Sequence, residues 1–272
     1  MILKRKIYKK LLEWKKECQG KKALLIEGAR RIGKSTICEE FGKNEYESYL
    51  LIDFAKKDNE VEMYFERYLN DLDTFFMLLQ THFGTKLTER NSLIIFDEVQ
   101  MFPQARAAIK YLVADGRYDY IETGSLISIR ENVKNIVIPS EERHINMYPL
   151  DFEEFAIALE EDLLVEYIKK CFEKREPLER SMHNQAMLLF HQYMLVGGMP
   201  MPVVTFIESK KDFTEADREK RDILKLYRED IMKIDAKYRS KVLAIYDQIP
   251  GFLSQHEKRV GMSMNRDQVF VC

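Results

Sequence analysis

The sequence has few cysteines, and the four it has lie far apart. They form no Cys-x-x-Cys pair, and no histidine lies at the spacing of a metal ligand. These absences argue against a disulfide framework and against a structural zinc site. A reducing cytoplasm is the simplest compartment for such a chain. The cysteines are Cys18, Cys38, Cys171 and Cys272.

Long apolar runs are also absent. No stretch approaches the roughly 20 apolar residues that a membrane-spanning helix needs. The basic start of the chain, residues 1–10, is not followed by the apolar core of a signal peptide. The sequence therefore predicts a soluble, cytoplasmic protein with no membrane association.

The chain has almost no net charge, with 43 basic and 45 acidic residues. This balance gives no overall field that would draw the protein onto nucleic acid or an anionic membrane. Local basic clusters remain, in residues 1–22 and within the mixed-charge stretch 208–241. Each is interpreted either as a solvated helix face or as a patch for an anionic partner.

Short apolar runs alternate with helical patterns in the first half of the chain. Continuous apolar runs are typical of parallel strands that are covered on both faces. Strands that alternate with helices predict a parallel α/β sheet with right-handed crossovers. The predicted strands are 23–27, 49–54, 93–96, 118–122 and 145–148, and the clearest predicted helices are 58–80 and a segment after Pro103.

The pattern changes after Pro149. Residues 151–166 hold seven acidic residues and no basic one. From there to about Gly251 the spacing predicts helices only, interrupted by a turn at residues 196–200. We therefore predict two parts, an α/β domain at 1–150 and a second part at 151–272 that is helical to about Gly251.

Residues 28–35 match the P-loop motif G-x-x-x-x-G-K-[ST] in full. The motif follows a predicted strand and precedes a helical run, which is the context it requires. Its glycines let backbone N–H groups surround phosphates at a helix N-terminus, and Lys34 neutralises the β- and γ-phosphates. Ser35 is the expected Mg²⁺ ligand. The predicted nucleotide-binding residues are Gly28, Ala29, Arg30, Arg31, Ile32, Gly33, Lys34, Ser35 and Thr36.

An acidic pair follows the third predicted strand. The strand delivers Asp97 and Glu98 at its carboxyl end, the edge where open α/β sheets bind ligands. Asp97 is the expected second Mg²⁺ ligand, and Glu98 the expected base that accepts a proton from an attacking water. Gln100 is placed to orient the water or Glu98.

For two further sets of residues, the sequence allows either a functional or a structural role. Thr123 or Ser125, after the fourth strand, either senses the γ-phosphate or belongs to a turn. Arg143, before the fifth predicted strand, and Arg117, before the fourth, either stabilise the transition state or are surface arginines.

With these motifs in place, the chain resembles the bacterial and archaeal AAA+/STAND-like ATPases along nearly its whole length. In that family a P-loop domain is followed by a conserved domain of uncertain function. The matching residues are Tyr8, Leu11, Leu12, Trp14, Lys15, 28–36, 96–100, Pro103, 123–125, 147–150, 152–155, 196–200, Ile223, Leu224, Tyr227, Asp230, Ile231, Lys233, Tyr246, Ile249 and Pro250.

The resemblance implies a sheet in which the P-loop strand lies between the fourth and fifth strands, followed by a helical lid. It implies ATP and Mg²⁺ as ligands, and it supports the roles of Lys34, Ser35, Asp97, Glu98 and Thr123 or Ser125. It leaves the arginine finger open, because residues 139–142 before Arg143 lack the glycine often found in that loop. Relatives also continue beyond residues 249–250 into further modules, so we expect a truncated or frameshifted copy that ends at Cys272 soon after 259–261.

Three functions follow as hypotheses. The first is an ATPase whose lid or partner moves on hydrolysis, and the second is a slow, ATP-dependent switch with a protein partner or self-association. The third is a DNA-associated protein that uses ATP structurally, which the balanced charge supports least. A nucleotide kinase is a further alternative, although no acceptor-nucleotide site is evident.

Overall fold

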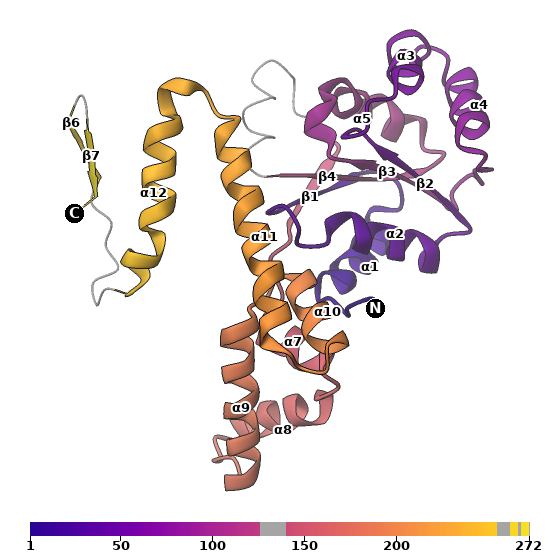
Figure 1. The fold of residues 1–272 in the computed structure, drawn as a ribbon. Helices are drawn as coiled ribbons and strands as arrows, with labels where there is room; N and C mark the ends of the chain where they lie inside the picture. Colours follow the sequence, from indigo (N-terminus) through magenta and orange to yellow (C-terminus); the bar gives the residue numbers. More distant parts are fainter. Residues whose placement is uncertain (126–139, 255–261, 266–267, 272) are drawn as a thin grey trace.

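The computed structural model describes residues 1–125, 140–254, 262–265 and 268–271. The expectations that concern Pro139, residues 259–261 and Cys272 lie outside the described residues. Within the described parts, the chain forms a parallel sheet covered by helices on both faces, followed by a helical region (Figure 1).

The sheet has five parallel strands in the order β2-β3-β4-β1-β5. The predicted α/β fold is confirmed, and so is the placement of the P-loop strand between the fourth and fifth strands. Because all five strands are parallel, their carboxyl ends meet at one edge of the sheet. The strands are β1 (Ala23–Glu27), β2 (Ser48–Asp53), β3 (Ser92–Asp97), β4 (Asp119–Gly124) and β5 (Glu142–Asn146).

The fifth strand begins earlier than predicted, and this corrects the position of Arg143. The residue lies inside β5, where it pairs with Leu24 of β1, and not in the loop before it. As an edge strand, β5 alternates between covered and exposed residues, whereas β3 and β4 are buried throughout. A half-exposed edge strand shows no continuous apolar run, so the sequence pattern placed it three residues late.

Helices cover both faces of the sheet (Figure 1). One face packs against α1 (Ile7–Cys18) and α2 (Lys34–Glu45) through a core that includes Trp14 and Phe41. The other face packs against three helices through an aromatic core. These helices are α3 (Asn59–Arg67), α4 (Leu72–Phe83) and α5 (Pro103–Asp115), the last with Pro103 at its start as predicted.

The single helix expected at 58–80 is wrong, because the segment forms α3 and α4 with a break between them. The Asp71 carboxylate accepts a hydrogen bond from the Thr74 N–H at 3.2 Å and so starts a new helix. Phe65 of α3 and Phe75 of α4 are both buried in the same core. The helical spacing of apolar residues therefore continues from α3 into α4, although the Asp71 cap starts a new helix between them.

The region after Pro149 is helical to Ser254, as predicted. It has a core of its own, to which Leu3 from the N-terminal segment contributes. Its helices are α7 (Phe152–Ala158), α8 (Asp162–Lys174), α9 (Arg180–Val196), α10 (Pro200–Glu208), α11 (Phe213–Met232) and α12 (Ala236–Ser254). A two-stranded antiparallel sheet follows, made of β6 (Met262–Asn265) and β7 (Gln268–Val271).

Within the described residues, no single helix is long and apolar enough to cross a membrane. Among the described helices, the pair α9 and α10 reaches that range when taken together, and the two helices are bent by 120° at their junction.

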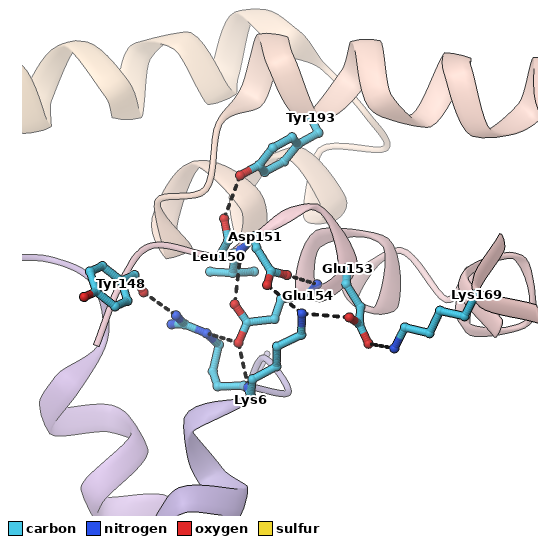
Figure 2. A network of polar contacts seen from close by, with 9 residues as sticks. Lys6, Tyr148, Leu150, Asp151, Glu153, Glu154, Lys169 and Tyr193 are labelled. Carbon is cyan, nitrogen blue, oxygen red and sulfur yellow. Dashed lines mark hydrogen bonds and ion pairs between the residues drawn. The ribbon is translucent and has the colours of Figure 1, made fainter. Parts of the chain in front are cut away.

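Polar contacts fix the junction between the sheet and the helical region (Figure 2). Asp151 and Glu154 form a reciprocal capping box that starts α7. The Tyr193 hydroxyl donates to the Leu150 carbonyl at 2.9 Å, and the Leu150 N–H donates to the Gly198 carbonyl at 2.7 Å. The turn predicted at 196–200 thus closes directly onto the end of the sheet domain.

Candidate nucleotide-binding site

The P-loop leaves β1 at the carboxyl edge of the sheet and enters α2. Gly33 adopts a φ of 88°, a conformation that favours glycine. At Gly28, an added Cβ would lie 2.4 Å from the Met147 carbonyl oxygen and 2.5 Å from Ile32 Cδ1. The loop therefore passes against the end of β5 at a distance that only glycine permits.

Backbone N–H groups of the loop are available to an anion. Two backbone hydrogen bonds flank the loop. The Gly28 N–H donates to the Gly124 carbonyl before it, and the Ile37 N–H donates to the Gly33 carbonyl after it. Between these two, the described residues provide no backbone acceptor for the N–H groups of 29–36. The first turn of α2 adds the partial positive charge of a helix N-terminus. The loop thus has the donors that a phosphate group requires.

Lys34 is buried at the base of this loop, with 5% of the residue exposed. Its ammonium donates to the Gly28 carbonyl at 3.1 Å and to the Ala29 carbonyl at 2.9 Å. Burial lowers the pKa of Lys34, while the nearby Glu98 and Asp97 carboxylates act to raise it. A cation held in a site with so little water interacts strongly with any anion that enters.

Asp97 and Ser35 meet at the carboxyl edge, from two separate elements. Ser35 Oγ lies 2.8 and 2.7 Å from the two Asp97 carboxylate oxygens. Thr123 donates its hydroxyl to the same carboxylate and accepts the Glu98 N–H at 3.2 Å. A hydroxyl and a carboxylate are the hard oxygen ligands that Mg²⁺ prefers, so these residues fit a magnesium ion.

Glu98 follows Asp97 in a left-handed conformation, with a φ of 52°. Asp97 is buried and Glu98 is half-buried. Gln100 donates its side-chain amide to the Glu98 carboxylate. Ser125 directly follows the end of β4 and is half-buried.

The two arginines considered from the sequence are not brought to the loop. The Arg143 guanidinium pairs with Glu17 of α1 at 2.6 Å. Arg117 pairs with Asp115 at 2.8 Å and Asp73 at 2.6 Å. Both have partners away from the P-loop in the structure.

Arg5 contacts the P-loop from the N-terminal segment, a role that the sequence analysis missed. Its guanidinium donates to the Ile32 carbonyl at 3.0 Å, the Tyr148 carbonyl at 2.6 Å and the Glu154 carboxylate at 3.2 Å. Figure 2 shows the Glu154 end of this network, where the carboxylate also accepts the Lys6 N–H at 2.6 Å. No local pattern distinguishes Arg5 from the surface lysines around it.

Two residues of α11 also reach the P-loop unexpectedly. Arg30 pairs with Asp230 at 2.6 Å, and the Tyr227 hydroxyl donates to the Arg30 carbonyl at 3.0 Å. Both partners stand among the residues that carry the family resemblance, which was the available signal. Contacts across about 200 positions leave no spacing pattern in the chain.

A buried charged cluster lies on the sheet face that carries α5. The Arg106 guanidinium holds Glu142 through hydrogen bonds of 3.0 and 2.8 Å, with both side chains almost fully buried. Glu122 is fully buried beside Glu142 of this pair. Burial and the neighbouring Glu142 raise the pKa of Glu122 well above its ordinary value.

Comparison with known proteins identifies one family. A family model described as an AAA domain matches residues 20–156, which is half of the chain. A structure of PCH-2 from C. elegans is similar with a TM-score of 0.38 and 11% identity. The similarity covers 79% of this chain and 65% of that one, so this chain spans less than two thirds of that structure's length. No curated protein sequence matches.

Proposed function

Since the chain belongs to the AAA domain family, we propose that it is a cytoplasmic ATPase that binds ATP with Mg²⁺ and hydrolyses it to ADP and phosphate. One observation carries the proposal. The Ser35 hydroxyl contacts both Asp97 oxygens at the start of α2, one residue after the buried Lys34 ammonium. A phosphate cradle, a cation and a pair of hard oxygen ligands thus lie together at one edge of the sheet.

The P-loop residues are proposed to bind the triphosphate. The N–H groups of 29–36 surround the phosphates, and Thr36 adds its hydroxyl to the α-phosphate. Lys34 exchanges its two carbonyl partners, Gly28 and Ala29, for phosphate oxygens. Because Lys34 is already desolvated, this exchange costs less hydration than it would at an exposed lysine.

Ser35 and Asp97 are proposed to hold the magnesium ion. Bound Mg²⁺ neutralises charge that develops on the phosphates during transfer. Thr123 fixes the orientation of Asp97 by donating to its carboxylate. Through its contact with the Glu98 N–H, Thr123 also couples the two acidic residues, so it is a positioning residue for both.

Glu98 is proposed to accept the proton of an attacking water. Its half-buried carboxylate is held by Gln100, which limits the directions in which it points. Holding a base in one orientation is what in-line attack on a phosphate requires. Ser125 lies at the end of β4, on the same edge, and is proposed to sense the γ-phosphate.

Residues 151–272 are proposed to act as a lid region that responds to ATP bound by residues 1–150. The P-loop contacts this region directly through the Arg30–Asp230 pair. Arg5 joins the Ile32 carbonyl to Glu154 of α7 in the same way. A change in loop conformation therefore reaches α7 and α11 without an intermediate element.

A slow switch that acts through a protein partner or self-association is the second candidate function. The observation in its favour is that Arg143 and Arg117 are held by acidic partners away from the loop. Arginine at the transferring phosphate raises turnover by orders of magnitude. Unless Arg143 leaves Glu17 or acts from a second copy, hydrolysis is expected to be slow.

The substitution Glu98→Gln tests the proposed activity. We expect it to lower ATP turnover at least 100-fold, because general-base catalysis contributes about 10²–10⁴-fold. ATP binding, measured by calorimetry, should change little, while Lys34→Ala should abolish it. Turnover that is unaffected by Glu98→Gln contradicts the proposed base. Tight ATP binding without measurable turnover in the unsubstituted protein favours the switch.

A further inference from the structure

Arg30 is tied to α11 at both its side chain and its backbone. Its guanidinium lies 2.6 Å from each Asp230 oxygen, and its carbonyl accepts the Tyr227 hydroxyl at 3.0 Å. Tyr227 and Asp230 are three residues apart and so lie on one face of the helix. Figure 1 shows α11 passing beside the edge of the sheet from which the P-loop leaves β1. This face of α11 is therefore docked on the phosphate-binding loop.

The Arg30–Asp230 pair is suited to breaking. The two side chains are 51% and 28% exposed, and ion pairs with that exposure change an equilibrium by a few-fold at most. Asp230 has a second partner, because the Lys233 ammonium lies 2.9 Å from its carboxylate. When Arg30 leaves, Asp230 keeps a compensating charge and the helix suffers little penalty.

Phosphate groups compete with Asp230 for the same guanidinium. Arg30 is the third residue of the P-loop motif, between Gly28, which follows β1, and Lys34, which starts α2. A guanidinium binds phosphate oxygens through two parallel hydrogen bonds, and a triphosphate carries several times the charge of one carboxylate. With a triphosphate bound, Arg30 would have two anionic partners, Asp230 on α11 and the phosphates in the loop.

We propose that Arg30 is the residue through which bound triphosphate releases α11. This inference rests on the proposed function and specifies how the site is regulated. Arg30 pairs either with Asp230, which keeps the end of α11 docked, or with the phosphates, which weakens that docking. Because binding and docking compete, each weakens the other by the same factor.

The release of α11 extends to α12. The described part of α12 has no buried residue, and α11 holds it through a few surface contacts. Arg228 pairs with Asp247, and the Tyr246 hydroxyl donates to the Leu224 carbonyl at 3.3 Å. Nearer its start, α11 is anchored in the helical region by the buried Ala216 and Ile223, so the change at Arg30 is confined to the part of α11 after Ile223 and to α12.

Hydrogen exchange with a non-hydrolysable ATP analogue tests the inference. In the unsubstituted protein, the analogue should slow exchange in residues 28–36 and speed exchange in the part of α11 around Tyr227 and Asp230. Protection of the loop without any change in α11 would overturn the inference and leave the proposed function intact. No protection of the loop would instead overturn the proposed function, and the inference with it.

Two substitutions each remove one of the contacts between α11 and Arg30. Asp230→Asn removes the charge that holds Arg30, and Tyr227→Phe removes only the hydroxyl bond to its carbonyl. Each should speed α11 exchange before the analogue is added. Asp230→Asn should also bind the analogue about two- to five-fold more tightly, the factor expected for one exposed ion pair.

Glu229→Gln is the matched control, because Glu229 is exposed, adjacent to Asp230, and loses the same charge. Binding by Asp230→Asn that is no tighter than by Glu229→Gln would contradict the competition. Arg30→Gln completes the set. In this variant, the analogue should still protect residues 34–36 but should no longer change exchange in α11.

Discussion

Glu122 is a carboxylic acid whose surroundings leave no place for its negative charge. It is fully buried on β4, and the Arg106 guanidinium beside it already holds Glu142. One buried cation compensates only one of the two carboxylates, so ionisation of the other is disfavoured. This is the physical reason that the pKa of Glu122 lies well above its ordinary value.

The raised pKa makes the stability of the protein fall as pH rises. Below the ordinary pKa of a glutamate, both the folded and unfolded states carry the proton, and pH has no effect through this group. Above it, the unfolded chain loses the proton and the folded chain does not, so unfolding is favoured by about 1.4 kcal/mol per pH unit. This loss continues until the pH reaches the folded-state pKa of Glu122.

Glu122→Gln should therefore flatten the decline of stability toward high pH. The amide has no charge to lose, so the variant should gain most over the unsubstituted protein at the highest pH measured. Denaturant unfolding at a series of pH values gives the comparison. Glu173→Gln, at an exposed position on α8, is the control. Identical dependence of stability on pH in the two variants would contradict a raised pKa of Glu122.

Individual residues of the site were predictable from the sequence only where a local pattern marks them. Asp97 and Glu98 were found because a strand ending delivers them to the sheet edge, and a local pattern marks the ending. Glu122 was not found, because a buried acid inside a strand has no local signature. Arg5 and Asp230 act through partners 149 and 200 positions away, so their roles arise only from the folded chain.

At the scale of elements, the fold followed from apolar periodicity wherever an element is buried. The central strands β1, β3 and β4 are covered on both faces, and their apolar runs were found nearly at their true bounds. The edge strand β5 and the break between α3 and α4 were misplaced. In both, polar residues decide the boundary while the apolar spacing carries no information about it.

The junction of the P-loop with β5 gives a prediction at this scale. Gly28→Ala places a methyl group 2.4 Å from the backbone oxygen of Met147, which cannot move without shifting the end of β5. We expect a loss of about 1–3 kcal/mol in unfolding free energy from this overpacking, with weaker ATP binding. Denaturant unfolding and calorimetry measure the two effects.

Gly251→Ala is the control for that change, because an added Cβ at Gly251 in α12 meets nothing within 4 Å. Alanine is the better helix former, so this variant should be as stable as the unsubstituted protein or slightly more so. Equal unfolding free energies for the two variants would mean that the P-loop can move away from β5 at no cost. The close approach at Gly28 would then not contribute to stability.

At the scale of the whole molecule, the N-terminal segment joins the two regions. Leu3 belongs to the core of the helical region, and Trp14 of α1 belongs to a core of the sheet domain. Between them, Arg5 contacts Ile32, Tyr148 and Glu154. The side chains of Arg5 and Glu154 are only 6% and 7% exposed, so their pairing is sheltered from water.

Arg5→Met should therefore weaken the connection between the two regions as well as the overall stability. Removing one partner of a buried ion pair costs about 3–5 kcal/mol, because the other charge stays buried without compensation. Part of that loss should be recovered in the double variant Arg5→Met/Glu154→Gln, in which no uncompensated charge remains. Lys10→Met, at an exposed position of α1, should have little effect on stability.

The chain provides two optical probes that separate loss of stability from loss of connection. Trp14 is the only tryptophan and lies buried in the sheet domain, so its fluorescence reports that domain alone. Circular dichroism reports helices from both regions. In the unsubstituted protein the two transitions should coincide, because the regions unfold together. In Arg5→Met the dichroism should begin to change before the fluorescence, as the helical region unfolds first. Coincident transitions in the variant would show that Arg5 adds stability without joining the regions, and that the remaining contacts of α7, α10 and α11 hold them together.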